Sequence, residues 1–104
     1  MLELRPNCEW CDKALPPDSA EARICSYECT YCANCVETVL QNVCATCGGG
    51  FVPRPIRPRS RNKDGVRTGL DVHPASQKPV HSRWSPEEVA EISSRLAAVP
   101  AHQR

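Results

Sequence analysis

The chain has 104 residues, a formal net charge of +1, eight cysteines and ten prolines. This length suits one small domain with an appendage, and no apolar stretch approaches the length of a membrane span. Glu3, Arg5 and Pro6 stand where a secretory signal needs an apolar run, so we expect a cytoplasmic protein. Residues 1–50 carry seven acids and three bases, a formal −4, whereas residues 51–104 carry five acids and ten bases, a formal +5. The sequence therefore predicts an acidic head and a basic tail.

All eight cysteines lie between positions 8 and 47 and form four pairs. Two residues separate the partners in three pairs and three residues in the fourth; the pairs are Cys8/Cys11, Cys25/Cys29, Cys32/Cys35 and Cys44/Cys47. A two-residue spacing lets one tight turn direct both sulfurs at the same ion, and four thiolates complete a tetrahedral zinc site. A segment of about 40 residues buries too little apolar surface to fold unaided. We therefore expect two closed structural zinc sites, with no open coordination position for catalysis and no enzyme activity.

Disulfide formation and iron binding are the alternatives to zinc binding by these cysteines. Without a secretory signal, such spacing is more typical of metal binding than of disulfides. The run through Cys29, Cys32 and Cys35 resembles part of a ferredoxin cluster motif, but the fourth cysteine with a following proline is absent. The spacing leaves the distribution of the pairs open, because four pairs can share two ions as neighbouring, alternate or nested pairs.

Short elements are predicted between the cysteines. Proline and aspartate indicate a turn within residues 12–24. Residues 23–27 and 30–31 alternate enough to predict two short strands around a turn. Residues 35–43 predict a short helix, and its apolar face consists of Val36, Val39, Leu40 and Val43. We expect this face, together with Ile24 and Trp10, to pack around the metal sites.

The composition changes after the last cysteines, so we place the metal-binding module at residues 1–52. Residues 53–84 begin with a run of prolines and arginines and predict an extended linker. Ser85-Pro86-Glu87-Glu88 is a helix-start signal, and the apolar residues that follow predict an amphipathic helix over 85–99. This helix has three possible uses: docking on the head, pairing with a second chain, or filling a groove of a partner.

Six basic side chains of the linker are candidates for contact with a partner or with nucleic-acid phosphates. They are Arg54, Arg57, Arg59, Arg61, Lys63 and Arg67. No aromatic residue is interleaved with them to stack on bases. The alternative is a solubilising linker, or a strap that folds back on the acidic head. His73 and His81 could share a metal ion, but isolated histidines in a polar segment are usually solvated.

The order and spacing of the cysteine pairs resemble those of a RING finger, and the predicted helix falls where that family has its central helix. The resemblance implies a small metal-stabilised α+β fold of the treble-clef type, with a short β-hairpin, one short helix and cross-brace wiring. One zinc is then held by Cys8, Cys11, Cys32 and Cys35, and the other by Cys25, Cys29, Cys44 and Cys47.

Activity as a ubiquitin ligase is disfavoured. A RING finger that recruits a conjugating enzyme typically has an aliphatic residue after its first cysteine, a proline in its last cysteine turn and a basic residue just beyond. Those places are held here by Glu9, Ala45-Thr46 and Gly48.

The sequence is closer still to a family of small, mostly bacterial, cysteine-rich proteins of unassigned function, domain-of-unknown-function family 1272. The resemblance rests on the opening residues 1–8, the stretch from Cys25 to Cys32, the Cys-x-x-Cys-Gly-Gly motif at 44–49 with the Arg-Pro-rich run behind it, and His73-Pro74-Ala75-Ser76. It covers roughly residues 1–80 and implies no known activity.

These observations together predict a cytoplasmic, non-enzymatic protein that binds two zinc ions and serves as a protein-interaction or regulatory module. The first alternative is a zinc protein that binds nucleic acid through its basic tail. The second, which is disfavoured, is a RING-type ubiquitin ligase. We expect another protein as the partner and no association with a membrane.

Overall fold

Three short antiparallel strands organise the cysteine-rich half of the molecule. The computed structural model describes all residues from Met1 to Arg104. Strand β1 (Ala22–Ile24) lies between β2 (Thr30–Cys32) and β3 (Val52–Pro53). In the register, Arg23 is opposite Tyr31 on one side and Pro53 on the other. The predicted hairpin is therefore present, but its first strand ends at Ile24 because the chain then turns to form the Cys25–Cys29 loop.

The predicted helix after β2 forms, with a different start and a looser turn. A single α-turn, α1 (Ala33–Cys35), continues into a π-helical turn at Val36–Leu40. The turn ends at Gln41, where the backbone enters the left-handed region at φ 52°. The sequence pattern predicted a helix up to residue 43, but this left-handed residue ends it earlier. Val36 and Leu40 are buried, as expected for the apolar face.

Sulfur atoms and aliphatic side chains share one core. Its 13 buried residues include six cysteines, and the others are Leu15, Ala22, Tyr31, Val36, Leu40, Ala45 and Val89. Trp10 packs against this cluster, as expected. The rings of Tyr31 and Phe51 meet edge to face with centroids 5.5 Å apart, a favourable aromatic geometry. The small α+β fold predicted from the sequence is thus confirmed, with the cysteines at its centre.

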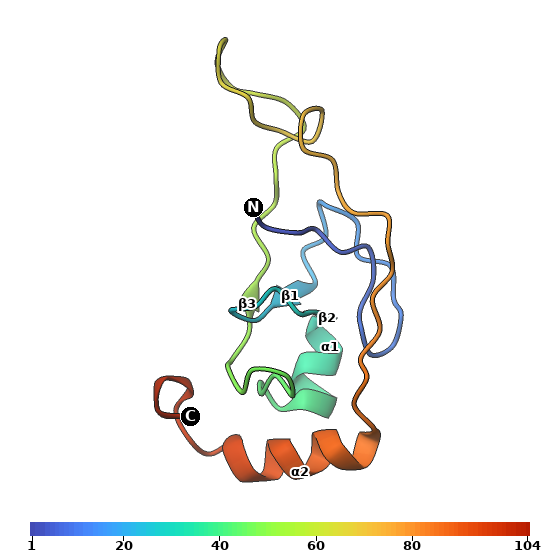
Figure 1. The fold of residues 1–104 in the computed structure, drawn as a ribbon, viewed down its shortest axis with the longest axis vertical. Coiled ribbons are helices and arrows are strands. Elements are labelled where there is room, and N and C mark those ends of the chain that lie inside the picture. Colours follow the sequence, from blue (N-terminus) through green and yellow to red (C-terminus); the bar gives the residue numbers. More distant parts are fainter.

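The segment after β3 is extended, and it returns to the head (residues 1–52) after forming a loop. In Figure 1 this loop projects from one end of the molecule, at the opposite end from the terminal helix α2 (Pro86–Leu96). We call residues 57–73 the distal loop and residues 74–84 the return strap. The strap runs beside the N-terminal segment, where the Ser76 amide donates to Leu4 O at 3.0 Å and the Ser82 amide to Glu9 O at 2.8 Å. Asn7 makes two hydrogen bonds to the backbone of Val80.

Helix α2 docks on the head, which is one of the three arrangements considered from the sequence. Ser85 caps the helix, and Glu88 completes a capping box, as predicted. The Val89 side chain is 2% exposed and belongs to the core, while Ser93 Oγ donates to Leu40 O at 3.0 Å. The helix ends at Leu96, before the predicted residue 99. None of the helices has the length and apolar character needed to cross a bilayer.

Candidate metal centre

The first cluster of sulfurs combines the first and third cysteine pairs. The sulfurs of Cys8, Cys11, Cys32 and Cys35 all lie within 4.8 Å of one another. The Cys11 and Cys32 sulfurs are 3.8 Å apart. In a tetrahedral site with zinc–sulfur bonds of about 2.3 Å, neighbouring sulfurs are about 3.8 Å apart. Of the four residues only Cys11 is exposed, so the cluster forms a nearly buried tetrathiolate site of a size that fits one ion.

Local backbone geometry brings these four sulfurs together. Between Cys8 and Cys11 the chain makes a tight turn, closed by a 2.9 Å hydrogen bond from the Asp12 amide to Cys8 O. Asp12 follows in the left-handed region at φ 66°. On the opposite side, Cys32 ends strand β2 and Cys35 ends α1. We call a tight turn that joins a cysteine pair a knuckle. The first knuckle, Cys8–Cys11, therefore faces the point where strand β2 continues into helix α1.

The second cluster combines the second and fourth pairs. The sulfurs of Cys25, Cys44 and Cys47 lie within 4.8 Å of one another; Cys29 is buried in the same core, near enough for Cys25 and Cys44 to affect its pKa, but its sulfur lies outside that 4.8 Å group. The last knuckle is closed by the Gly48 amide, which donates to Cys44 O at 2.7 Å. Gly48 adopts φ 79°, which is accessible to glycine without strain.

Backbone amides in the knuckles point at the sulfurs. The Tyr27 amide donates to Cys25 Sγ at 3.3 Å, the Cys35 amide to Cys32 Sγ at 3.4 Å and the Gly49 amide to Cys47 Sγ at 3.4 Å. An N–H group that donates to sulfur favours its thiolate form, which is the form that binds a metal. Both clusters therefore contain backbone donors that support coordinated thiolates.

The crowded thiols also differ in acidity. Hydrogen bonds from Cys25 and Cys44 lower the pKa of Cys29 to about 3. Hydrogen bonds with Cys25 and then with Cys29 raise the pKa of Cys44 above its ordinary value. Burial, followed by the hydrogen bond with Cys32, raises the pKa of Cys35. Thiols that lie this close to one another compete for protons. A cation that binds all four sulfurs of a cluster removes this competition, because each bound sulfur is a thiolate.

The two clusters are interleaved along the chain, which is the grouping that the RING resemblance implies. Along the chain, the first and third pairs form one cluster, and the second and fourth pairs form the other. Neither cluster can form until residues that are far apart in the sequence meet. All eight cysteines are free thiols. The 3.8 Å between the Cys11 and Cys32 sulfurs is nearly twice the length of a disulfide bond, about 2.05 Å.

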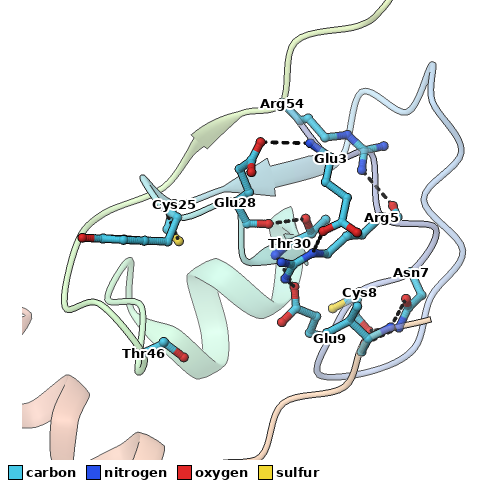
Figure 2. A network of polar contacts seen from close by, with 12 residues as sticks. Glu3, Arg5, Asn7, Cys8, Glu9, Cys25, Glu28, Thr30, Thr46 and Arg54 are labelled. Atoms are coloured by element: carbon cyan, nitrogen blue, oxygen red, sulfur yellow. Dashed lines mark hydrogen bonds and ion pairs between the residues drawn. The ribbon is translucent and has the colours of Figure 1, made fainter. Parts of the chain in front are cut away.

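A partly buried ion pair between Glu9 and Arg5 ties the first knuckle to the N-terminal segment, and no local pattern in the sequence predicts it. Figure 2 shows the Glu9 carboxylate facing inward, where it accepts hydrogen bonds from the Thr30 amide and from Arg5 at 2.8 Å. Arg5 also contacts Glu3 at 2.7 Å. Burial alone lowers the pKa of Arg5, but its hydrogen bonds to Glu3 and Glu9 outweigh that effect and hold the pKa above its ordinary value. Glu9 therefore links the first knuckle to β2.

Arg54 is the clearest correction to the set of candidate contact residues. Its side chain is 4% exposed and donates to Arg5 O at 2.9 Å, Leu15 O at 3.1 Å and Pro16 O at 3.0 Å. Burial lowers its pKa. Arg54 is therefore unavailable to nucleic-acid phosphates, because three carbonyls occupy its guanidinium. The contacts are invisible in the local sequence, since Leu15 is 39 residues away.

The other five candidate contact residues lie in the distal loop, where they are less buried than Arg54. Arg57 is partly buried and donates to Leu2 O at 2.7 Å and His73 O at 2.8 Å. The remaining four are exposed, and they are Arg59, Arg61, Lys63 and Arg67. The two histidines considered together in the sequence have separate partners: His73 Nε2 contacts Arg67 O, and His81 Nε2 contacts the Asp12 carboxylate, both at 3.2 Å.

Comparison with known proteins agrees with the cysteine pattern. Residues 1–57 match the family described as "Protein of unknown function (DUF1272)". An uncharacterised protein of Rhizobium meliloti (strain 1021), R02474, is 60% identical over 63 residues, which are 61% of this chain and 75% of that protein. No solved structure matches the chain. Because the family match spans more than half of its residues, the chain belongs to the DUF1272 family.

Proposed function

We propose that this protein holds two zinc ions in its eight cysteines and acts as a non-enzymatic protein-interaction or regulatory module in the cytoplasm. The observation that carries the proposal is the interleaved pair of cysteine clusters. Metal-binding energy in such sites is folding energy, so the ions would hold together a head whose strands contain only two or three residues each.

The spacing of the sulfurs favours a single ion over an iron–sulfur cluster. A cluster places several iron and sulfide ions between its cysteines and so spreads their sulfurs apart. Here the four sulfurs of the first cluster lie within 4.8 Å of one another, the Cys11–Cys32 distance being 3.8 Å. Zinc is the common resident of closed four-cysteine sites. Reduced thiols in such clusters persist in the cytoplasm rather than in an oxidising compartment, which supports the proposed location.

Closed coordination supports a non-enzymatic role. Four sulfurs for each ion leave no position for a water molecule or a substrate, which a catalytic zinc requires. Ubiquitin transfer is disfavoured on a further observation. The residue after the first cysteine, where a RING finger presents an aliphatic side chain to the conjugating enzyme, is Glu9, and Glu9 is 6% exposed and paired with Arg5.

An apolar surface near the second cluster supports a protein partner. Tyr27 is 73% exposed in the loop between Cys25 and Cys29. With Thr46 and Cys47 it lines a shallow hollow of about 230 Å³. Val52, which pairs with Ile24 in the sheet, is also exposed. Exposed tyrosine beside a rigid metal knuckle suits protein contact, because few rotatable bonds must be ordered on binding.

Nucleic-acid binding is the second candidate. The observation that favours it is the exposure of Arg59, Arg61, Lys63 and Arg67 on one projecting loop. Such binding should weaken steeply with salt. It should also survive Arg54→Ala in a folded protein, since Arg54 is buried.

Elemental analysis combined with native mass spectrometry tests the proposal on protein purified without added metal. We expect two zinc ions per chain and loss of native circular dichroism on chelation. Visible absorbance with bound iron, or a mass short by paired hydrogens, would contradict it.

The partner surface requires a separate test. Tyr27→Ser should weaken capture of a partner, whereas Ile56→Ser, which alters an exposed apolar residue outside the Tyr27 hollow, should not. Equal capture by both variants would contradict a role for this surface.

A further inference from the structure

The distal loop, which lies at the end of the molecule opposite helix α2 (Figure 1), borders an open cavity of about 570 Å³, the largest of the molecule. The polar residues along it are Arg57, Arg67, His73, Asn62 and Thr68, and Met1, Pro58 and Gly69 complete the lining. Two arginines, a histidine, an asparagine and a threonine thus border one space, and no carboxylate residue is among the lining residues, although the Asp71 carboxylate lies close to Gly69. The volume lies within the range of small-molecule sites, about 300–1,000 Å³.

Backbone contacts fix the shape of this loop. The Leu70 amide donates to Pro58 O at 2.9 Å and the Asp71 amide to Arg59 O at 3.2 Å, which closes the loop at its base. Gly69 adopts φ 105°, and a Cβ at this position would lie 2.8 Å from backbone atoms of Ser60. Only glycine allows that approach of the two sides. The cavity is therefore defined by main-chain geometry as well as by long side chains.

Arg57 is held in place on one side of the cavity. Its guanidinium donates to Leu2 O and His73 O, so two of its five N–H donors are used and three remain. These two carbonyls orient the planar group without neutralising its charge. Arg67 and His73 are coupled through the 3.2 Å contact between His73 Nε2 and Arg67 O. A preorganised arginine loses less side-chain entropy on binding than a free one.

The charges around the cavity favour an oxyanion. The distal loop holds two acids: Asp64, which is paired with Arg61 at 3.2 Å, and Asp71, whose carboxylate oxygen would lie 3.0 Å from a Cβ at Gly69. Five basic residues of the loop outnumber them and leave it a formal charge of +3. Arginine donors match the oxygen geometry of phosphate, to which they bind through two parallel hydrogen bonds. Hydroxyl and amide donors from Thr68 and Asn62 can bind the remaining oxygens.

We propose that this cavity binds the phosphate group of a small phosphorylated molecule, with Arg57 and Arg67 as the charged donors. A terminal phosphate monoester carries close to two negative charges and offers three oxygens. A monoester can enter a concave site with its phosphate group first. A phosphodiester within a polynucleotide continues as chain on both sides, so the strand would have to run through the site. This site is independent of the two metal clusters, which lie in the head.

The test is a titration of the metal-loaded full-length protein, followed by amide NMR shifts. The probes are inorganic phosphate, adenosine monophosphate, adenosine and a single-stranded oligonucleotide. We expect phosphate and the monophosphate to bind in the cavity, with shifts at Thr68, Gly69 and His73, and adenosine to cause none. Arg67→Gln should weaken binding of the monophosphate about tenfold.

Arg59→Gln is the matched control, because Arg59 is an exposed arginine of the same loop that forms no ion pair and does not line the cavity. It should change the dissociation constant less than about twofold. Equal losses in both variants would overturn the proposal in favour of general attraction to a basic loop. Binding of the oligonucleotide without binding of phosphate or the monophosphate would also overturn it. Zinc content should be unchanged in both variants, so failure here is separable from failure of the metal sites.

Discussion

Substitution of Arg54 tests whether this residue of the basic segment stabilises the head. We expect Arg54→Ala to destabilise the head, because the variant leaves the carbonyls of Arg5, Leu15 and Pro16 without their donor. A hydrogen bond from a charged donor contributes about 1.5–3 kcal/mol, while burial of the guanidinium, which lowers its pKa, offsets part of the total. We expect a net loss of about 3 kcal/mol in the free energy of unfolding.

Urea unfolding at a fixed free zinc concentration measures this loss, since bound metal adds to the stability of the native state. Arg54→Lys should recover only part of it, because one ammonium cannot reach three carbonyls from two segments. Arg59→Ala, at an exposed arginine of the distal loop, should stay within about 0.5 kcal/mol of wild type. A loss below about 0.5 kcal/mol for Arg54→Ala would refute the structural role of this residue.

Three further predictions follow from the core. Cys32→Ser should lose the first metal and most native circular dichroism, because the remaining three sulfurs leave that site open; retention of two zincs with a native spectrum would contradict this. Val89→Ala should cost about 2 kcal/mol in urea unfolding and speed amide exchange in α2, with Val66→Ala, at an exposed site, as control. Burial, followed by the charge of Glu9, raises the pKa of Tyr31, so its neutral form favours the folded state and this contribution is lost only as strongly alkaline pH ionises the phenol. In a Tyr27→Phe protein, in which Tyr31 is the remaining tyrosine, phenolate absorbance should therefore appear only with unfolding. Absorbance that rises before unfolding would contradict this.

Local signals explain most of what the sequence predicted correctly. The cysteine spacing determines the knuckles because each is a turn of a few residues, and Ser85 with Glu88 marks the start of α2 for the same reason. The spacing alone left the pairing of the knuckles open, since that depends on contacts between distant segments. The RING resemblance implied the interleaved grouping, and the structure places the cysteines in that arrangement.

The role of a side chain could not be predicted from the sequence where its partners are backbone groups far along the chain. Arg54 was grouped with the candidate contact residues because it belongs to the run of prolines and arginines, yet its partners include the carbonyls of Leu15 and Pro16. Glu9 was recognised as a departure from the RING pattern, but its pairing with Arg5 and the Thr30 amide had no local signal. Strand β3 contains two residues, one of them Pro53, so neither propensity nor alternation could predict it.

The central claim is that two metal ions are each held by four interleaved cysteines. Replacing the metal with cadmium-113 and recording cadmium–proton correlation spectra reports directly which cysteine β-protons share each ion. We expect two cadmium resonances, one coupled to Cys8, Cys11, Cys32 and Cys35 and the other to Cys25, Cys29, Cys44 and Cys47. A resonance coupled to both Cys8 and Cys25, or a single resonance for the whole protein, would contradict the account.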